Sequence, residues 1–117
     1  MSVTMLGASG CAALLIGAGA AGGYAISKDS IKNHFDLSPD HVYRISRDVA
    51  GELGLVTTED PRHGLIQADV QGSTVTITIK PVSEKTVELK VKARDKIFLP
   101  KIEIAQTVYN KIVARLP

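Results

Sequence analysis

The chain has 117 residues, with 14 basic against 12 acidic side chains, a net charge of +2 and one cysteine. This near balance of charge implies neither nucleic-acid binding nor a strongly acidic partner, and a single cysteine excludes an internal disulfide. Every charged side chain lies between Lys28 and Arg115. The sequence therefore predicts an uncharged N-terminal segment followed by one small domain, near the lower size limit for a core without disulfides or metal.

The only cysteine, Cys11, follows a run of small and apolar residues, Leu6-Gly7-Ala8-Ser9-Gly10. Small residues directly before a lone cysteine, behind an apolar segment, are the pattern that a lipoprotein signal peptidase cuts before the thiol is acylated, for instance with palmitate. We therefore predict that residues 1–10 are a signal peptide and that Cys11 is the lipidated first residue of the mature protein. A secretory signal also needs a positively charged start, which residues 1–10 lack. We therefore expect Met1 to be an internal methionine of a longer precursor.

The residue after the anchor is Ala12. An aspartate at that place is the usual inner-membrane retention signal in many Gram-negative bacteria. Its absence predicts an outer-membrane lipoprotein that faces the periplasm, if the organism has two membranes. Residues 11–35 are then the anchor cysteine and a glycine-rich spacer. Residues 17–22 spell a dinucleotide-binding fingerprint, but no apolar strand leads into an acidic residue at the right distance, so no nucleotide is expected.

The glycines of this segment also have the spacing of a helix-packing face. Gly19 and Gly23 form a G-x-x-x-G pair, which lets helix backbones approach closely in lipid. Without cleavage, the uncharged residues 1–27 are long enough to span a bilayer, since about 20 residues suffice. The alternative function is therefore an integral membrane protein whose glycine-rich helix oligomerises and carries the folded domain as a soluble cap.

The folded domain is expected over residues 36–117 and begins with a helix over residues 39–53. Ser38 is a suitable N-cap, and Gly54 is the expected stop. Apolar and polar residues then alternate in several segments, which predicts antiparallel strands with one dry and one wet face. These four segments are residues 55–59, 65–71, 74–80 and 86–93. A second amphipathic helix closes the chain.

The order α-β-β-β-β-α predicts an α+β two-layer sandwich, with a four-stranded antiparallel sheet and both helices on its dry face. The wet face is expected to be a plane rich in threonine and lysine, formed by Thr76, Thr78, Lys80, Glu88, Lys90 and Lys92. One interpretation is an ordinary solvated face whose lysines prevent edge aggregation. The other is a docking surface for an envelope protein, an anionic lipid headgroup or a cell-wall polymer, and an outer strand could also recruit a peptide.

Candidate catalytic and metal-binding residues are few. The histidines His34, His41 and His63 share no metal-ligand spacing. Glu59, Asp60 and His63 lie together in one predicted turn, but polar residues are common in turns for conformational reasons. We therefore expect no enzymatic activity, no metal and no cofactor.

Residues 10–13, the alanine- and glycine-rich segment up to Tyr24, and residues 52–55 and 75–81 resemble the domain-of-unknown-function 3568 family. This is a family of small bacterial proteins, most of them predicted lipoproteins. The resemblance implies a lipid-anchored protein of the bacterial envelope and supplies no catalytic residues. Together with the residue patterns, it predicts a non-enzymatic interaction or structural module of unknown ligand, held at the membrane by its lipid.

Overall fold

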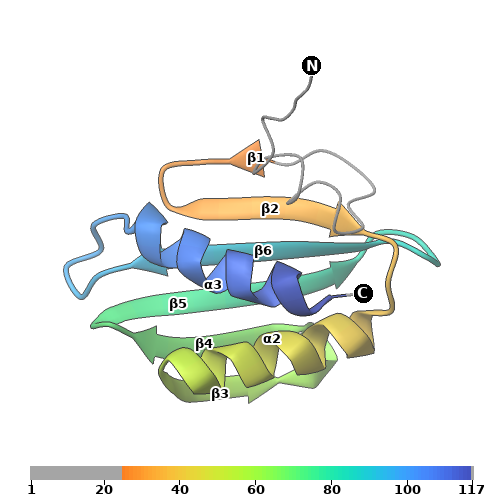
Figure 1. The fold of residues 1–117 in the computed structure, drawn as a ribbon, viewed down its shortest axis with the longest axis horizontal. Helices are drawn as coiled ribbons and strands as arrows, with labels where there is room; N and C mark the ends of the chain where they lie inside the picture. Colours follow the sequence, from red (N-terminus) through yellow and green to blue (C-terminus); the bar gives the residue numbers. More distant parts are fainter. Residues whose placement is uncertain (1–24, 117) are drawn as a thin grey trace.

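The computed structural model describes residues 25–116. They form an α+β two-layer sandwich in which one antiparallel sheet carries two helices on one face (Figure 1), so the predicted fold class is confirmed. Cys11, Gly19 and Gly23 lie outside the described residues, as do the predicted signal peptide and most of the spacer. No helix in the described range is long and apolar enough to cross a membrane.

The sheet has six strands in the spatial order β1-β2-β6-β5-β4-β3, and all neighbouring strands are antiparallel. In chain order the strands are β1 (Ala25–Ile26), β2 (Ser30–Phe35), β3 (Leu55–Asp60), β4 (Leu65–Val70), β5 (Ser73–Pro81) and β6 (Val87–Arg94). The last four correspond to the four predicted strands. The predicted four-stranded sheet is therefore wrong in its strand number, because the sequence interpretation places β1 and β2 in the spacer.

The hydrophobic pattern does not predict β2, because a polar residue occupies the central inward position of this strand. Ile31, Asn33 and Phe35 are all 0% exposed, and the side chains between them are partly or fully exposed. This is the alternation of a half-buried strand, but the inward asparagine removes the apolar periodicity on which such a prediction depends. Residues 25–35, predicted as spacer, therefore belong to the sheet.

Helix α2 (Pro39–Leu53) has the predicted bounds and the predicted caps. The side chain of Ser38 accepts a hydrogen bond from the backbone N–H of His41 at 3.2 Å, which satisfies one of the free donors of the first turn. At the other end, a Cβ atom on Gly54 would lie 2.0 Å from the carbonyl oxygen of Asp69. Only glycine therefore lets the chain pass this close to β4 as it leaves the helix.

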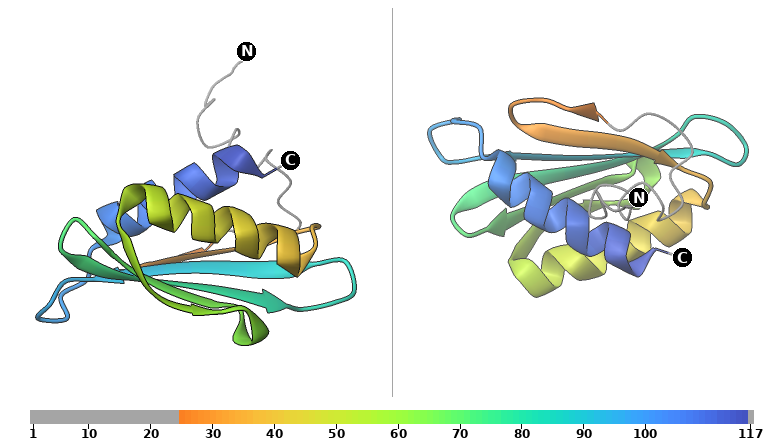
Figure 2. Two further views of the ribbon diagram at one scale, coloured as in Figure 1. Left: turned by 90° about the horizontal axis from the view of Figure 1, so that it is seen from below. Right: turned by 45° about the horizontal axis from the view of Figure 1, so that its top comes forward.

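Helix α3 (Ile102–Arg115) packs beside α2 on the same face of the sheet (Figure 2). A hydrogen bond of 2.6 Å from Arg115 to Glu52 joins the C-terminal ends of the two helices. The core lies between the helices and the inner sheet face, and its largest fully buried side chains include Phe35, Val49, Ile66, Ile77, Leu89, Tyr109 and Ile112. Figure 2 shows both helices on one side, so the described residues leave the opposite sheet face open.

Candidate functional site: the open sheet face and the loop beside it

The open face is the side of the sheet that points away from α2 and α3. The structure places all six residues of the predicted polar plane there, in three directly opposed pairs between β5 and β6. The pairs are Thr76 with Lys92, Thr78 with Lys90, and Lys80 with Glu88. The intervening residues of both strands are buried in the core, so the alternation predicted from the sequence fixes which side chains face outward.

Strand β2 extends this plane with residues that the sequence interpretation did not include. Lys32 lies directly opposite Lys90, and His34 lies directly opposite Glu88. The His34 Nε2 and Glu88 Oε1 atoms are 3.3 Å apart, whereas neither lysine forms an ion pair within residues 25–116. Like charges directly opposite each other destabilise a sheet, so this arrangement is not explained by the stability of the fold.

Four lysines from three neighbouring strands thus share the open face, namely Lys32, Lys80, Lys90 and Lys92. In the part of the chain that the structure describes, none of them forms an ion pair within 4.0 Å. The net charge of the chain is only +2, but the four lysines of this face outnumber its carboxylates, Glu88 and Asp69. The open face is consequently suited to attract an acidic surface.

The loop between β6 and α3 borders the open face and carries three consecutive exposed apolar residues. Ile97, Phe98 and Leu99 are 72%, 74% and 52% exposed. The backbone of Phe98 has a φ of 68°, a left-handed conformation that costs a residue other than glycine roughly 1–2 kcal/mol. A bulky aromatic residue at a strained and exposed position is a feature that stability alone does not explain.

Asp95 organises the backbone of this loop. Its Oδ1 atom accepts hydrogen bonds from the N–H groups of Ile97 and Leu99, each at 2.9 Å. Its carbonyl oxygen accepts from the N–H of Phe98 at 3.0 Å, and its own N–H donates to the carbonyl of Leu99 at 2.9 Å. The N–H groups at the tip of the loop are therefore satisfied from within the loop.

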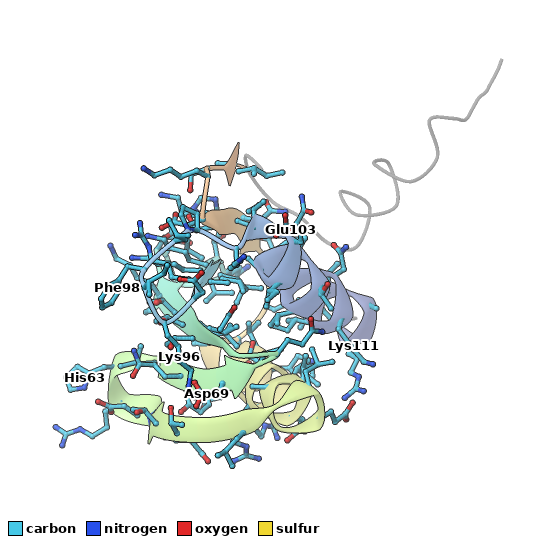
Figure 3. The ribbon with its side chains drawn as sticks, turned by 90° about the vertical axis from the view of Figure 1, so that its left-hand side faces the viewer. His63, Asp69, Lys96, Phe98, Glu103 and Lys111 are labelled. Carbon is cyan, nitrogen blue, oxygen red and sulfur yellow. The ribbon has the colours of Figure 1, made fainter. Side chains whose placement is uncertain are left out.

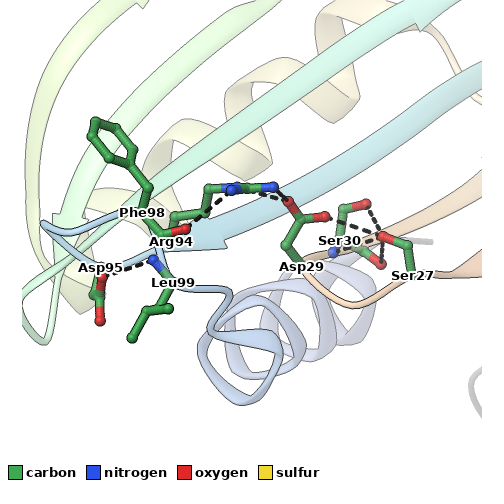
Figure 4. Close-up of polar contacts among 7 residues, drawn as sticks. All are labelled: Ser27, Asp29, Ser30, Arg94, Asp95, Phe98 and Leu99. Atoms are coloured by element: carbon green, nitrogen blue, oxygen red, sulfur yellow. Dashed lines mark hydrogen bonds and ion pairs between the residues drawn. The ribbon is translucent and has the colours of Figure 1, made fainter.

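Arg94 connects the loop to the turn between β1 and β2 (Figure 4). Its Nη1 atom donates to the carbonyl of Phe98 at 3.0 Å, and its Nε atom donates to Asp29 Oδ2 at 2.8 Å. The Ser27 hydroxyl donates to the other oxygen of Asp29 at 3.2 Å. Burial would raise the pKa of Asp29, but the hydrogen bonds from Arg94 and Ser27 outweigh it and lower the pKa below its usual value.

A hollow of about 770 Å³ lies between the start of α2, the connection from β3 to β4 and the end of β5, and it shares Thr78 and Lys80 with the open face. Arg44, Arg47, Arg62 and Lys80 line it together with Tyr43. The Tyr43 hydroxyl donates to the backbone carbonyl of Leu65 in β4 at 3.2 Å. Its pKa is raised mainly by burial and further by the nearby carboxylates of Glu59 and Asp60. Arg44 and Arg47 lie on α2 and Arg62 lies in the turn between β3 and β4, while Lys80 comes from the end of β5.

The three histidines occupy three different places: His34 on β2, His41 on α2 and His63 in the turn η1 (Pro61–His63). His63 Nδ1 lies 2.8 Å from Asp60 Oδ2, which lowers the pKa of Asp60. The side chain of Glu59 does not join those of Asp60 and His63 as a third metal ligand. Between residues 25 and 116, no three histidine, cysteine or carboxylate side chains come together as a metal site.

The fold and site define a small α+β domain with one covered and one open polar sheet face. The chain belongs to the DUF3568 family, because the family model described as "Protein of unknown function (DUF3568)" matches residues 1–95. The match therefore includes all six strands and α2, and ends before α3. No curated protein matches the sequence.

Proposed function

We propose that this protein is a membrane-anchored, non-enzymatic interaction module of the bacterial envelope, and that it binds an acidic partner through its open sheet face. The observation that carries this proposal is the placement of Lys32 directly opposite Lys90. Like charges directly opposite each other disfavour strand pairing, and a negatively charged partner would compensate for them. Lys80 and Lys92 widen the same positive area.

The anchor in this proposal is the thiol of Cys11, which follows a run of small residues after an apolar segment. Membership of the DUF3568 family is compatible with it, because the matched residues 1–95 include this cysteine. With Ala12 after the anchor, the proposed location is the periplasmic side of an outer membrane. The folded domain then presents its open face within the envelope.

The arrangement of the open face favours binding over catalysis. Its threonines and lysines form a ladder across β5 and β6 that borders two open hollows, whereas catalytic groups usually converge in a concave site that excludes water. A broad polar face with a few strong charges instead matches an interaction surface, where complementary charge determines the choice of partner and the rate of encounter.

Site-specific photo-crosslinking in cells that express the complete gene tests this proposal. A photoreactive amino acid at Thr76 samples the open face, and the same group at Asn110 samples the exposed side of α3. We expect crosslinked adducts with a partner, either a protein or a lipid, from position 76 and none from position 110. The double substitution Lys90→Glu with Lys92→Glu should abolish the adducts, and Lys111→Glu on α3 should not. Equal adducts at both positions, or none at either, would contradict the proposal.

A further inference from the structure

We propose that the acidic partner of the open face is the surface of an anionic lipid bilayer, and that the loop over residues 95–100 inserts its apolar tip into that surface. This inference rests on the proposed function for the role of the open face. It adds the identity of the partner and the part of the chain that enters it.

The loop and the open face form one continuous surface. Phe98 projects on the open side of the sheet, whereas Lys111 on α3 lies on the opposite side (Figure 3). A shallow hollow of about 210 Å³ connects the loop to the face, and it is lined by Thr74, Thr76, Lys92, Arg94, Asp95 and Phe98. A flat partner that touches the lysines of the face therefore also meets the loop.

The composition of the loop fits the boundary between lipid headgroups and acyl chains. Ile97, Phe98 and Leu99 form its exposed tip, and Lys96 and Lys101 stand directly before and after the run that ends at Pro100. Apolar side chains enter the interfacial region while flanking cations remain among the headgroups. The lysines of the open face add electrostatic attraction to anionic lipid.

The N–H groups of the tip are also satisfied before any partner binds. The N–H groups of Ile97, Phe98 and Leu99 all donate to Asp95, and the next residue, Pro100, has no N–H. Lipid cannot satisfy free backbone groups, so an inserted segment must satisfy them internally. A peptide could not pair with the loop as an added strand through these three N–H groups, because they are occupied.

The loop is held in its exposed conformation before any partner binds. Arg94 bridges the carbonyl of Phe98 to the carboxylate of Asp29 on the neighbouring turn. The left-handed backbone of Phe98 is thereby maintained in a conformation that projects the ring outward. Because the loop does not have to become ordered on contact, less of the interaction energy is lost when it inserts.

Tryptophan fluorescence of the full chain in vesicles tests the inference, because the sequence contains no tryptophan. Phe98→Trp places a single reporter at the tip of the loop. Val82→Trp is the matched control, since Val82 is also exposed but lies in the turn at the other end of β6. The vesicles contain phosphatidylcholine and phosphatidylglycerol with brominated acyl chains, which quench only a tryptophan that reaches them.

We expect the emission of Phe98→Trp to shift to shorter wavelength and to lose most of its intensity, while Val82→Trp remains unquenched. Adding Lys90→Glu and Lys92→Glu, or omitting phosphatidylglycerol, should reduce the quenching. If Phe98→Trp stays unquenched while the protein remains with the vesicles, the insertion of the loop is overturned. The proposed lipid anchor at Cys11 would still hold. Adducts to another protein from position 76, together with an unquenched Phe98→Trp, would retain the proposed function and identify a protein partner instead.

Discussion

The side-chain amide of Asn33 donates a hydrogen bond to the hydroxyl of Tyr109 across 2.9 Å, and both residues are completely buried. The bond joins β2 to α3, near the two ends of the described chain. A buried amide without a partner costs about 1–3 kcal/mol. This pair therefore allows a polar residue to occupy an inward position of the sheet.

Replacing Asn33 with alanine should lower the free energy of unfolding by about 2 kcal/mol, because the change leaves a cavity and removes a buried hydrogen bond. Urea unfolding followed by circular dichroism measures this effect. The neighbouring Lys32→Ala is the control, because Lys32 is exposed and lies opposite Lys90, so its replacement should not lower the stability. Equal effects of both substitutions would show that the buried pair does not stabilise β2.

A chain that starts at Asp36 should not unfold cooperatively, although the hydrophobic pattern alone predicts residues 36–117 as the whole domain. It lacks Ile31 and Phe35, each 0% exposed, and burying such a side chain contributes about 1.5–3 kcal/mol. It also leaves β6 as an unprotected edge strand. Calorimetry should show a cooperative transition for residues 25–117 and none for residues 36–117. A cooperative transition in both would mean that β2 is dispensable.

The contribution of Asp29 to stability should depend on pH. Its folded-state pKa lies below the usual value of 3.8, so its ionised form stabilises the fold above that value, and the contribution is lost as the pH falls through the folded-state pKa. Asp29→Asn should therefore lower the melting temperature at pH 7 and have progressively less effect below pH 3.8. A difference in melting temperature that is the same at pH 7 and at pH 2.5 would rule out this ionic contribution.

Adjacent substitutions on β5 should differ strongly because they lie on opposite faces of the sheet. Ile77 is 0% exposed, so Ile77→Asp places a carboxylate without a partner in the core, at a cost of several kcal/mol. Thr78 lies on the open face opposite Lys90, so Thr78→Asp should leave the stability nearly unchanged. Chemical denaturation of both variants measures the difference. Comparable losses would mean that the two faces are assigned incorrectly.

The hydrophobic pattern predicts the strands whose inward residues are mostly apolar, namely β4, β5 and β6. Residues 65–70, 74–80 and 87–93 alternate cleanly, so the polar plane of Thr76, Lys90 and their neighbours could be placed from the sequence. β2 could not be found in this way, because Asn33 interrupts the apolar series and its partner Tyr109 is distant in the chain. The opposition of Lys32 and Lys90 follows only once β2 is known.

The loop beside the open face carries no periodic signal. Its apolar run, Ile97 to Leu99, reads from the sequence as residues between a strand and a helix. Its exposure depends on the hydrogen bonds of Asp95 and on the positive φ of Phe98. These are set by contacts that include the distant Asp29, so tertiary structure was needed to identify the loop as part of the site.

Whether the protein is anchored through Cys11 is tested most directly by mass spectrometry of the N-terminal peptide, purified from membranes of cells that express the complete gene. We predict a peptide that begins at Cys11 and carries the mass of a diacylglyceryl group. The Cys11→Ser variant should lack this mass and should no longer be recovered with the membranes. An unmodified Cys11 within a longer, uncleaved N-terminal peptide would contradict the lipid anchor.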